Sequence, residues 1–497
     1  MCVYCYNGIN NMHHHSSKRN KMIKIIAIYA GMTSLTVATA LFIIMLVLGF
    51  RLDTDSGQIE QLSLLQFNSS PIGATVAVDG KVVSGQTPNK TSATEGNHEI
   101  VVWREGYETW RKTVYVKPGS MTWLNYILLV PQKMTSESVA NYDTLAASLA
   151  SPGGKYMMIH KKADAPVFDL VDLSGDTVKT TELTMPKKTY SEAYNNNAKH
   201  SFVVDKWDPG ERYVLVKHIY SDKFEWLVMD TQNADTTKNI TKLFNLTFDN
   251  LLFSGNGGNV LFVLESGNIR KVDTNAETIS KLLVSNVVQF SLYGSNIITY
   301  IGAADMVGRV VGLYRDGDTA PYIIKTITGD ATVPLRVAAG YYFKEDYVAI
   351  SSGKQVEILK GNYQNAIISD ASGLKHFAIF DAASDISDLS FSHGGQYILA
   401  QSGTSFSSYD LEYQKPTTST IDAVGSAAHL SWLNGSYLWS DNGGNLNTRE
   451  FDNANSRIIN PVVVGQDATV TVNGRYIYSI GKSESGYQLQ RVRIILP

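Results

Sequence analysis

Cysteine is nearly absent from this chain of 497 residues. Its two cysteines, Cys2 and Cys5, lie at the amino end, and none follows. Disulfides therefore cannot hold residues 6–497 together, and hydrophobic cores must do so, which this length permits. The C-x-x-C pair and three histidines at positions 13–15 would supply an incomplete zinc site in a polar segment. We interpret residues 1–24 as an unstructured tail instead.

Charged residues are missing from residues 25–50. As a helix, this run is about 39 Å long, enough to cross a bilayer with some tilt. A buried helix of a globular protein normally has a polar face, but this run offers only small hydroxyl residues and one tyrosine. We therefore predict a transmembrane helix over residues 25–50, with the lipid bilayer as its partner.

Charge is distributed unevenly around this predicted helix. The flanking residues are Lys18, Arg19, Lys21 and Lys24 before it, and Arg51, Asp53, Asp55 and Glu60 after it. By the positive-inside rule, the short amino end is cytoplasmic and everything after residue 51 is extracytoplasmic. The apolar run is too long for a signal-peptide core, and its one A-x-A motif, Ala38 to Ala40, lies inside it. We therefore expect an uncleaved signal anchor and a single-pass protein of the cell membrane.

Compact catalytic motifs are also missing. "GTSFS" from Gly403 lacks the last glycine of a G-x-S-x-G elbow, and no H-E-x-x-H occurs. The histidines beyond the tail are scattered along the chain: His98, His160, His200, His218, His376, His393 and His429. The sequence thus identifies no catalytic, cofactor-binding or metal-binding residue and no cofactor, and we expect a protein that is not an enzyme. A net charge of −3 gives no reason to expect nucleic acid as a partner.

Two acidic segments remain as candidates for calcium. Asp316-Gly317-Asp318 and residues 441–445 offer oxygen ligands, but neither is followed by the bidentate glutamate of a twelve-residue calcium loop. Asp, Asn and Gly are also the residues that tight hairpins require, so we predict turns at both places.

Short alternating strands fill residues 61–131. The segments are "LSLLQF", "ATVAV", "KVV", "HEIVVWREGY", "TWRKTVYV" and "TWLNYILLV". Asp79-Gly80 between the second and third predicts a type I′ hairpin turn. The pattern predicts a small all-β unit of about 70 residues with one thin core.

Turn and strand residues of this unit follow a known order. They are Pro71 to Ala74, Val78 to Lys81, Thr87-Pro88, the strand Gly96 to Val101, and Glu105 to Tyr107. This order resembles PEGA domains, small extracytoplasmic β-sandwiches of bacterial envelope proteins. Ile72 stands where the name motif has Glu, and "NKTSATE" replaces the usual turn before "GNHEIVV". The resemblance implies a structural or interaction module without catalytic residues.

One β-pattern recurs between residues 140 and 497. It is clear in "SPGGKYMMI", "WDPGERYVLV", "FSGNGGNVLFV", "FSHGGQYILA", "WLNGSYLWS" and "TVNGRYIYSI", and weaker in the segments from Gln289 and Arg336. A period of about 40 to 50 residues is typical of four-stranded propeller blades. We predict a β-propeller of seven or eight blades, eight favoured, over a sheet sandwich. The last repeat has three strands, so we expect a strand from the start of the domain to complete it.

The turns of the repeat resemble those of TolB-like and related WD-type propellers, with Gly153 and His393 where these families usually carry Asp. The aromatic residues before the turns, Trp207, Phe391 and Trp432, are expected to pack between blades, with a sugar-stacking surface as the alternative. The polar loop "KKTYSEAYNNNAKHS", residues 187–201, is longer than a blade connection needs. Long loops on rigid scaffolds frequently carry binding residues, but many are merely tolerated insertions.

These observations lead to one functional hypothesis and two alternatives. We expect a membrane-anchored protein of a bacterial envelope whose PEGA-like module and propeller bind an envelope protein or cell-wall glycan. One alternative is an envelope hydrolase or lyase with a site assembled at the propeller mouth from several blades. A purely structural spacer is the other.

Overall fold

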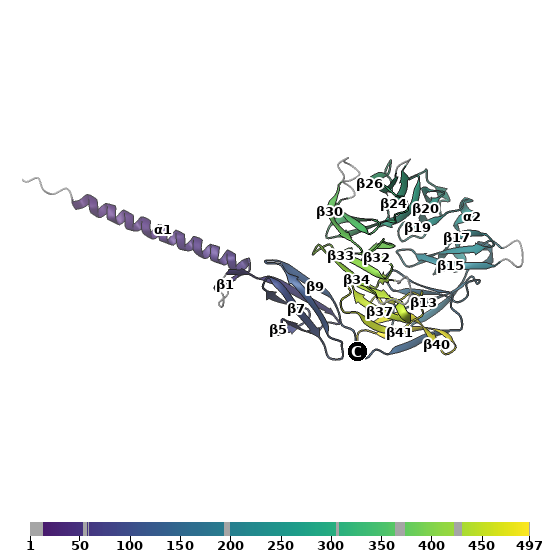
Figure 1. Cartoon of the computed structure of the whole chain (residues 1–497), viewed down its shortest axis with the longest axis horizontal. Helices are drawn as coiled ribbons and strands as arrows, with labels where there is room; N and C mark the ends of the chain where they lie inside the picture. Colours follow the sequence, from purple (N-terminus) through teal and green to yellow (C-terminus); the bar gives the residue numbers. More distant parts are fainter. Residues whose placement is uncertain are drawn as a thin grey trace, which may run out of the picture. The chain divides into compact units, whose positions relative to one another are not determined.

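The computed structural model describes residues 13–52, 57, 59–192, 199–304, 308–362, 373–421 and 430–496. The chain divides into two compact units, Met1–Leu129 and Val130–Pro497. Figure 1 shows one long helix, α1, in the first unit and strands throughout both.

Helix α1 spans His13–Val47, so residues 13–24 are helical where we expected an unstructured tail. Its segment Arg19–Val47 is long and apolar enough to cross a membrane. It ends three residues before the predicted boundary at residue 50. Gly49 has φ +82°, a left-handed conformation that ends helices, and Phe50 already begins a strand. That strand, β1 (Phe50–Leu52), pairs antiparallel with β2 (Ile59–Gln61).

The rest of the first unit is a sandwich of two sheets. Their strand orders are β6-β3-β9 and β5-β4-β7-β8. The strands are β3 (Ser63–Ser70), β4 (Thr75–Val78), β5 (Lys81–Gln86), β6 (Asn89–Ala93), β7 (Gly96–Trp103), β8 (Trp110–Val116) and β9 (Met121–Leu128). Phe67, Val76, Ile100 and Leu124 are among the side chains buried in this unit. The turn Asp79-Gly80 has positive φ at both residues, +49° and +76°, as the predicted type I′ hairpin requires.

Strand β6 is the element that the sequence did not reveal. Its residues lie in "NKTSATE", which looks like a polar loop, yet β6 pairs antiparallel with β3 along its whole length. β6 is an edge strand, and of its five residues only Ala93 is fully buried. It therefore needs no apolar alternation, which is the signal that marks the other strands.

The second unit contains eight four-stranded sheets in its described residues. Blades 1 to 4 are β11 (Ala147–Ala150), β12 (Tyr156–His160), β13 (Val167–Asp172), β14 (Lys179–Thr184); β15 (His200–Trp207), β16 (Tyr213–Tyr220), β17 (Lys223–Asp230), β18 (Lys238–Asn239); β19 (Asn250–Phe253), β20 (Val260–Glu265), β21 (Asn268–Asp273), β22 (Thr278–Ile279); and β23 (Val287–Tyr293), β24 (Ile297–Ala304), β25 (Gly308–Arg315), β26 (Tyr322–Thr328). Blades 5 to 7 are β27 (Leu335–Tyr342), β28 (Glu345–Ser352), β29 (Gln355–Gly361), β30 (Leu374–Asp381); β31 (Asp388–Phe391), β32 (Tyr397–Ser402), β33 (Ser405–Asp410), β34 (Lys415–Thr420); and β35 (Leu430–Trp432), β36 (Tyr437–Ser440), β37 (Asn445–Glu450), β38 (Arg457–Pro461). These sheets are arranged in a ring in Figure 1, so the unit is an eight-bladed propeller.

Blade 8 closes the ring as predicted. It combines β39 (Thr469–Val470), β40 (Tyr476–Ser483) and β41 (Gly486–Arg493) with β10 (Ser136–Tyr142) from the start of the unit. β10 pairs antiparallel with β41, so both ends of the described propeller chain lie in one sheet. Blade 8 is also joined to blade 1, because the carboxylate of Asp467 accepts the backbone N–H of Ala150 at 2.9 Å. The β10 strand begins four residues before the predicted start at residue 140.

The turn between the first two strands of a blade is held by a side-chain oxygen. Asp208 Oδ1 accepts the N–H of Tyr213 at 2.6 Å, and Asn434 Oδ1 accepts that of Tyr437 at 2.8 Å. Because neighbouring strands are antiparallel, the turns between second and third strands lie at the opposite ends of the blades, with the connections from blade to blade. We call this side of the propeller the connection face.

The aromatic residues before the turns pack between blades, as expected. Trp207 of blade 2 stacks on Tyr156 of blade 1, with ring centroids 6.2 Å apart. Trp432 stacks on Tyr397, and Phe391 packs against the buried cluster shared by blades 5 and 6. These contacts bury apolar area between neighbouring sheets and so stabilise the ring.

Candidate functional site on the connection face

One buried carboxylate on the connection face, that of Glu225 of β17, accepts four hydrogen bonds. Its side chain is 0% exposed. It accepts hydrogen bonds from His218 Nδ1 at 2.9 Å, from the N–H and hydroxyl of Ser191 at 2.6 and 2.9 Å, and from Asn239 Nδ2 at 2.7 Å. A buried carboxylate with this many donors holds three separate segments together.

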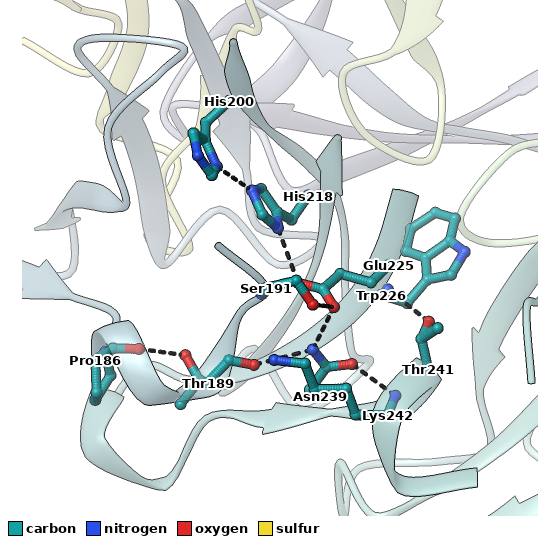
Figure 2. A network of polar contacts seen from close by, with 10 residues as sticks. All are labelled: Pro186, Thr189, Ser191, His200, His218, Glu225, Trp226, Asn239, Thr241 and Lys242. Atoms are coloured by element: carbon teal, nitrogen blue, oxygen red, sulfur yellow. Dashed lines mark hydrogen bonds and ion pairs between the residues drawn. The ribbon is translucent and has the colours of Figure 1, made fainter. Parts of the chain in front are cut away.

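The three segments are the β16–β17 hairpin of blade 2, the loop that precedes blade 2, and β18, the last strand of that blade. Asn239 is the N-cap of the short helix α2 (Ile240–Phe244), since its Oδ1 accepts the N–H of Lys242 at 2.9 Å. Its Nδ2 also donates to the carbonyl of Thr189, at 2.9 Å. Figure 2 shows how Asn239 thereby links the helix to the loop and to Glu225.

Two histidines extend this network away from Glu225. His218 is 0% exposed, and its Nε2 lies 2.8 Å from Nδ1 of the partly exposed His200 (Figure 2). Because the carboxylate accepts from His218 Nδ1, the neutral His218 ring has its lone pair on Nε2 and accepts from His200 Nδ1. The neutral His200 ring is then left with its lone pair on Nε2. The chain of bonds therefore sets the tautomers of both rings.

Aromatic rings enclose the two histidines. The rings of His200 and His218 are stacked, with centroids 5.1 Å apart, and Phe202 and Tyr220 stack on His218 at 4.4 and 5.1 Å. Tyr190, next to Ser191 in the loop, meets the His218 ring edge-on at 5.2 Å. This packing fixes both imidazoles in position, as a preorganised binding surface requires.

The pKa of Glu225 reflects this environment. Burial alone raises it, but the hydrogen bonds from His218, Asn239 and Ser191 outweigh burial and lower the pKa to about 2. The carboxylate is therefore ionised at neutral pH and acts as a fixed acceptor.

The network does not have the arrangement of a Ser-His-Glu triad. The hydroxyl of Ser191 donates to Glu225 and not to an imidazole, so no base is in place to activate it. The side chain of the network that is available to a ligand is His200, whose Nε2 can accept a hydrogen bond from it.

The sequence identified the loop but not the network. Residues 187–201 stood out as a long loop that either carries binding residues or is a tolerated insertion. Its described part contributes Thr189, Tyr190, Ser191 and His200, while residues 193–198 lie outside the described residues. The 3₁₀ turn Lys187–Thr189 begins the loop. His218 and Glu225 are directly opposite each other in the β16–β17 hairpin. Their contact could have been predicted from the pairing register of these two strands.

The other histidines lie elsewhere. His98 pairs with Asp79 at 2.6 Å, His160 bonds to the carbonyl of Ala165, and His376 lies 3.1 Å from Glu357. His393 lies in the turn between β31 and β32. His429 falls outside the described residues.

The two acidic segments form turns. Asp316 pairs with Lys271, Asp318 pairs with Arg315, and Gly317 has φ +95°. In the other segment, Asn442–Gly444 form a 3₁₀ turn, and Asp441 Oδ2 accepts the N–H of Gly465. The described residues contain no group of three or more His, Cys, Asp or Glu side chains that could hold a metal ion.

Comparison with known proteins assigns the first unit. Residues 62–130 match the PEGA domain family. The chain thus combines a PEGA domain with a β-propeller, behind a helix that can span a membrane. No curated protein matches the chain.

Solved structures match the propeller at low identity. A "Dos1 propeller" is 10% identical with a TM-score of 0.45, over 73% of this chain and 95% of its own. Hsv2 from Kluyveromyces lactis is 10% identical with a TM-score of 0.39, over 71% and 99%. PorZ, a surface component of the type-IX secretion system of Porphyromonas gingivalis, is 9% identical with a TM-score of 0.38, over 70% and 43%. We transfer no function from them.

Proposed function

We propose that this protein is a membrane-anchored binding protein of a bacterial envelope, whose PEGA domain and propeller bind an envelope protein or cell-wall glycan outside the membrane. The observation that carries the proposal is the Glu225 network. A fully buried carboxylate fixes the loop at Ser191, the helix cap at Asn239 and the histidine pair in one geometry. Such rigid support reduces the ordering cost of binding.

The test is crosslinking of the tagged full chain in intact cells, followed by identification of the attached protein or glycan. We compare wild type with His200→Ala, which removes the partly exposed end of the network. His376→Ala is the matched control, because His376 is a surface histidine of blade 5 with a side chain that is 55% exposed. We expect one partner that is lost at least tenfold with His200→Ala and kept with His376→Ala. Equal recovery from all three proteins contradicts a binding role for this site.

One observation favours a second candidate function. The bond chain from Glu225 through His218 to His200 is the kind of arrangement that holds a general base in place. An envelope hydrolase or lyase with His200 as its base is therefore the alternative. Purified cell-wall polymer that is cut by the wild type but not by His200→Ala supports this alternative. Polymer that is bound and left intact supports the binding protein.

A further inference from the structure

A hollow of about 480 Å³ lies in the first unit, where α1 ends beside the PEGA domain. Its wall includes the end of the helix at residues 46–48, Arg51 of β1, Ser92 of β6 and the start of β9 at Met121. Two hydrogen bonds hold the chain at this end: Gln61 Nε2 to the Leu48 carbonyl at 3.1 Å, and the Leu62 N–H to the Gly49 carbonyl at 2.8 Å.

One wall of the hollow is apolar and open to the surroundings. Val47 is 80% exposed, Leu48 54% and Met121 44%. Covering apolar side chains at the end of a membrane-spanning helix with lipid is favourable, because it removes apolar surface from water. The apolar wall therefore continues the lipid-facing surface of the helix.

The other wall is polar and suits an anion. The hydroxyls of Ser63 and Ser120 already donate to the carbonyl of Lys117, which leaves the Ser92 hydroxyl and the Arg51 guanidinium as donors. Glu60 stands opposite Arg51 in the β1–β2 pair, but the Arg51 guanidinium makes no hydrogen bond or ion pair with a side chain that the structure describes. Among the described residues, no Asp or Glu lines the hollow.

The position of the hollow along α1 matches the level of lipid headgroups. A helix crosses the hydrocarbon core of a bilayer in about 20 residues. Counted from Ile25, the first residue after Lys24, the hydrocarbon ends near residue 45. Residues 46–51 then lie among the headgroups, and this step rests on the proposed membrane anchor.

We propose that this hollow binds one phospholipid, with the phosphate against Arg51 and Ser92 and the first acyl carbons against Val47, Leu48 and Met121. The lipid fills the space between the helix end and the sandwich, so it ties the PEGA domain to the membrane surface.

The test is native mass spectrometry of the full chain, released from nanodiscs of phosphatidylcholine with a minority of phosphatidylglycerol. Arg51→Gln removes the one cation among the described residues that line the hollow, and it is expected to reduce retained phosphatidylglycerol about fivefold. Ser92→Trp fills the hollow without changing charge and is expected to displace the lipid. Arg111→Gln is the matched control, since Arg111 lies on β8 and its side chain is 61% exposed.

The expected result is one retained phospholipid in wild type and Arg111→Gln, and its loss in the other two variants with unchanged thermal unfolding. Equal retention in all four proteins overturns the lipid site, as does displacement of the lipid by inorganic phosphate alone. A chain that stays soluble without detergent and never enters nanodiscs contradicts the membrane anchor itself, so the two failures are distinguishable.

Discussion

At the scale of single residues, Glu225 holds together one cluster of contacts on the connection face, that of blade 2. It holds Ser191, His218 and Asn239, which come from three different segments of the chain. Because the pKa of Glu225 is lowered to about 2 from an ordinary 4.5, the ionised form stabilises the folded state. This contribution is complete above about pH 4.5 and is lost as the pH falls toward 2.

We predict that the free energy of unfolding depends on this carboxylate in a defined pH window. A lowering of this size corresponds to about 3 kcal/mol. The free energy of unfolding of wild type should exceed that of Glu225→Gln at pH 5, and this difference should fall by about 3 kcal/mol when the pH is lowered to 2. Denaturant unfolding of the full chain in detergent measures it.

A matched control uses Glu182, a carboxylate of blade 1 that is 60% exposed and paired with Lys161. Glu182→Gln should cost less than about 1 kcal/mol at any pH, because exposed ion pairs contribute little. A constant gap between wild type and Glu225→Gln over the whole range would contradict the role of Glu225.

At the scale of elements, the β27–β28 turn shows a conflict between its residues and its backbone. Phe343 and Lys344 have φ of +47° and +67°, and the Phe343 side chain is 85% exposed. Two-residue hairpin turns with positive φ at both positions favour Asn-Gly, because other residues are strained there. The local sequence therefore opposes the turn that the flanking strands impose.

We predict that the double substitution Phe343→Asn and Lys344→Gly stabilises the propeller by about 1 kcal/mol, because it removes this strain. Differential scanning calorimetry measures the effect as a rise in Tm. Ser266→Asn in the β20–β21 turn is the control and should change Tm less, because Gly267 already supplies the second positive φ of that turn, +78°. A lower Tm for the double variant would show that the Phe343 side chain stabilises the fold by more than the turn strain costs.

At the scale of the whole molecule, the sequence determines the architecture well because the architecture repeats. Each blade buries its sheets against neighbours, so the apolar strands and the turn residues recur with one period, and a three-stranded last repeat implies closure by an early strand. The structure confirms both, with β10 completing blade 8. The features that the sequence did not predict lack a repeated or apolar pattern, such as the polar edge strand β6 and the helix end at Val47.

The candidate site was predictable only in part, for a physical reason. His218 and Glu225 belong to one hairpin, so their pairing follows from local strand register. Ser191, His200 and Asn239 reach the same place only because blade 2 brings its preceding loop and its last strand to one face. Such contacts depend on tertiary packing, which local sequence patterns do not predict.

The membrane arrangement can be tested directly by thiol labelling of intact cells, because the chain contains only two cysteines. In wild type, the only thiols are Cys2 and Cys5, and a membrane-impermeant maleimide should label them only after the cells are permeabilised. In a Cys2→Ser, Cys5→Ser background, Phe343→Cys places one thiol on the exposed β27–β28 turn, and it should be labelled without permeabilisation. Labelling of wild type in intact cells, together with protection of position 343, would contradict the account.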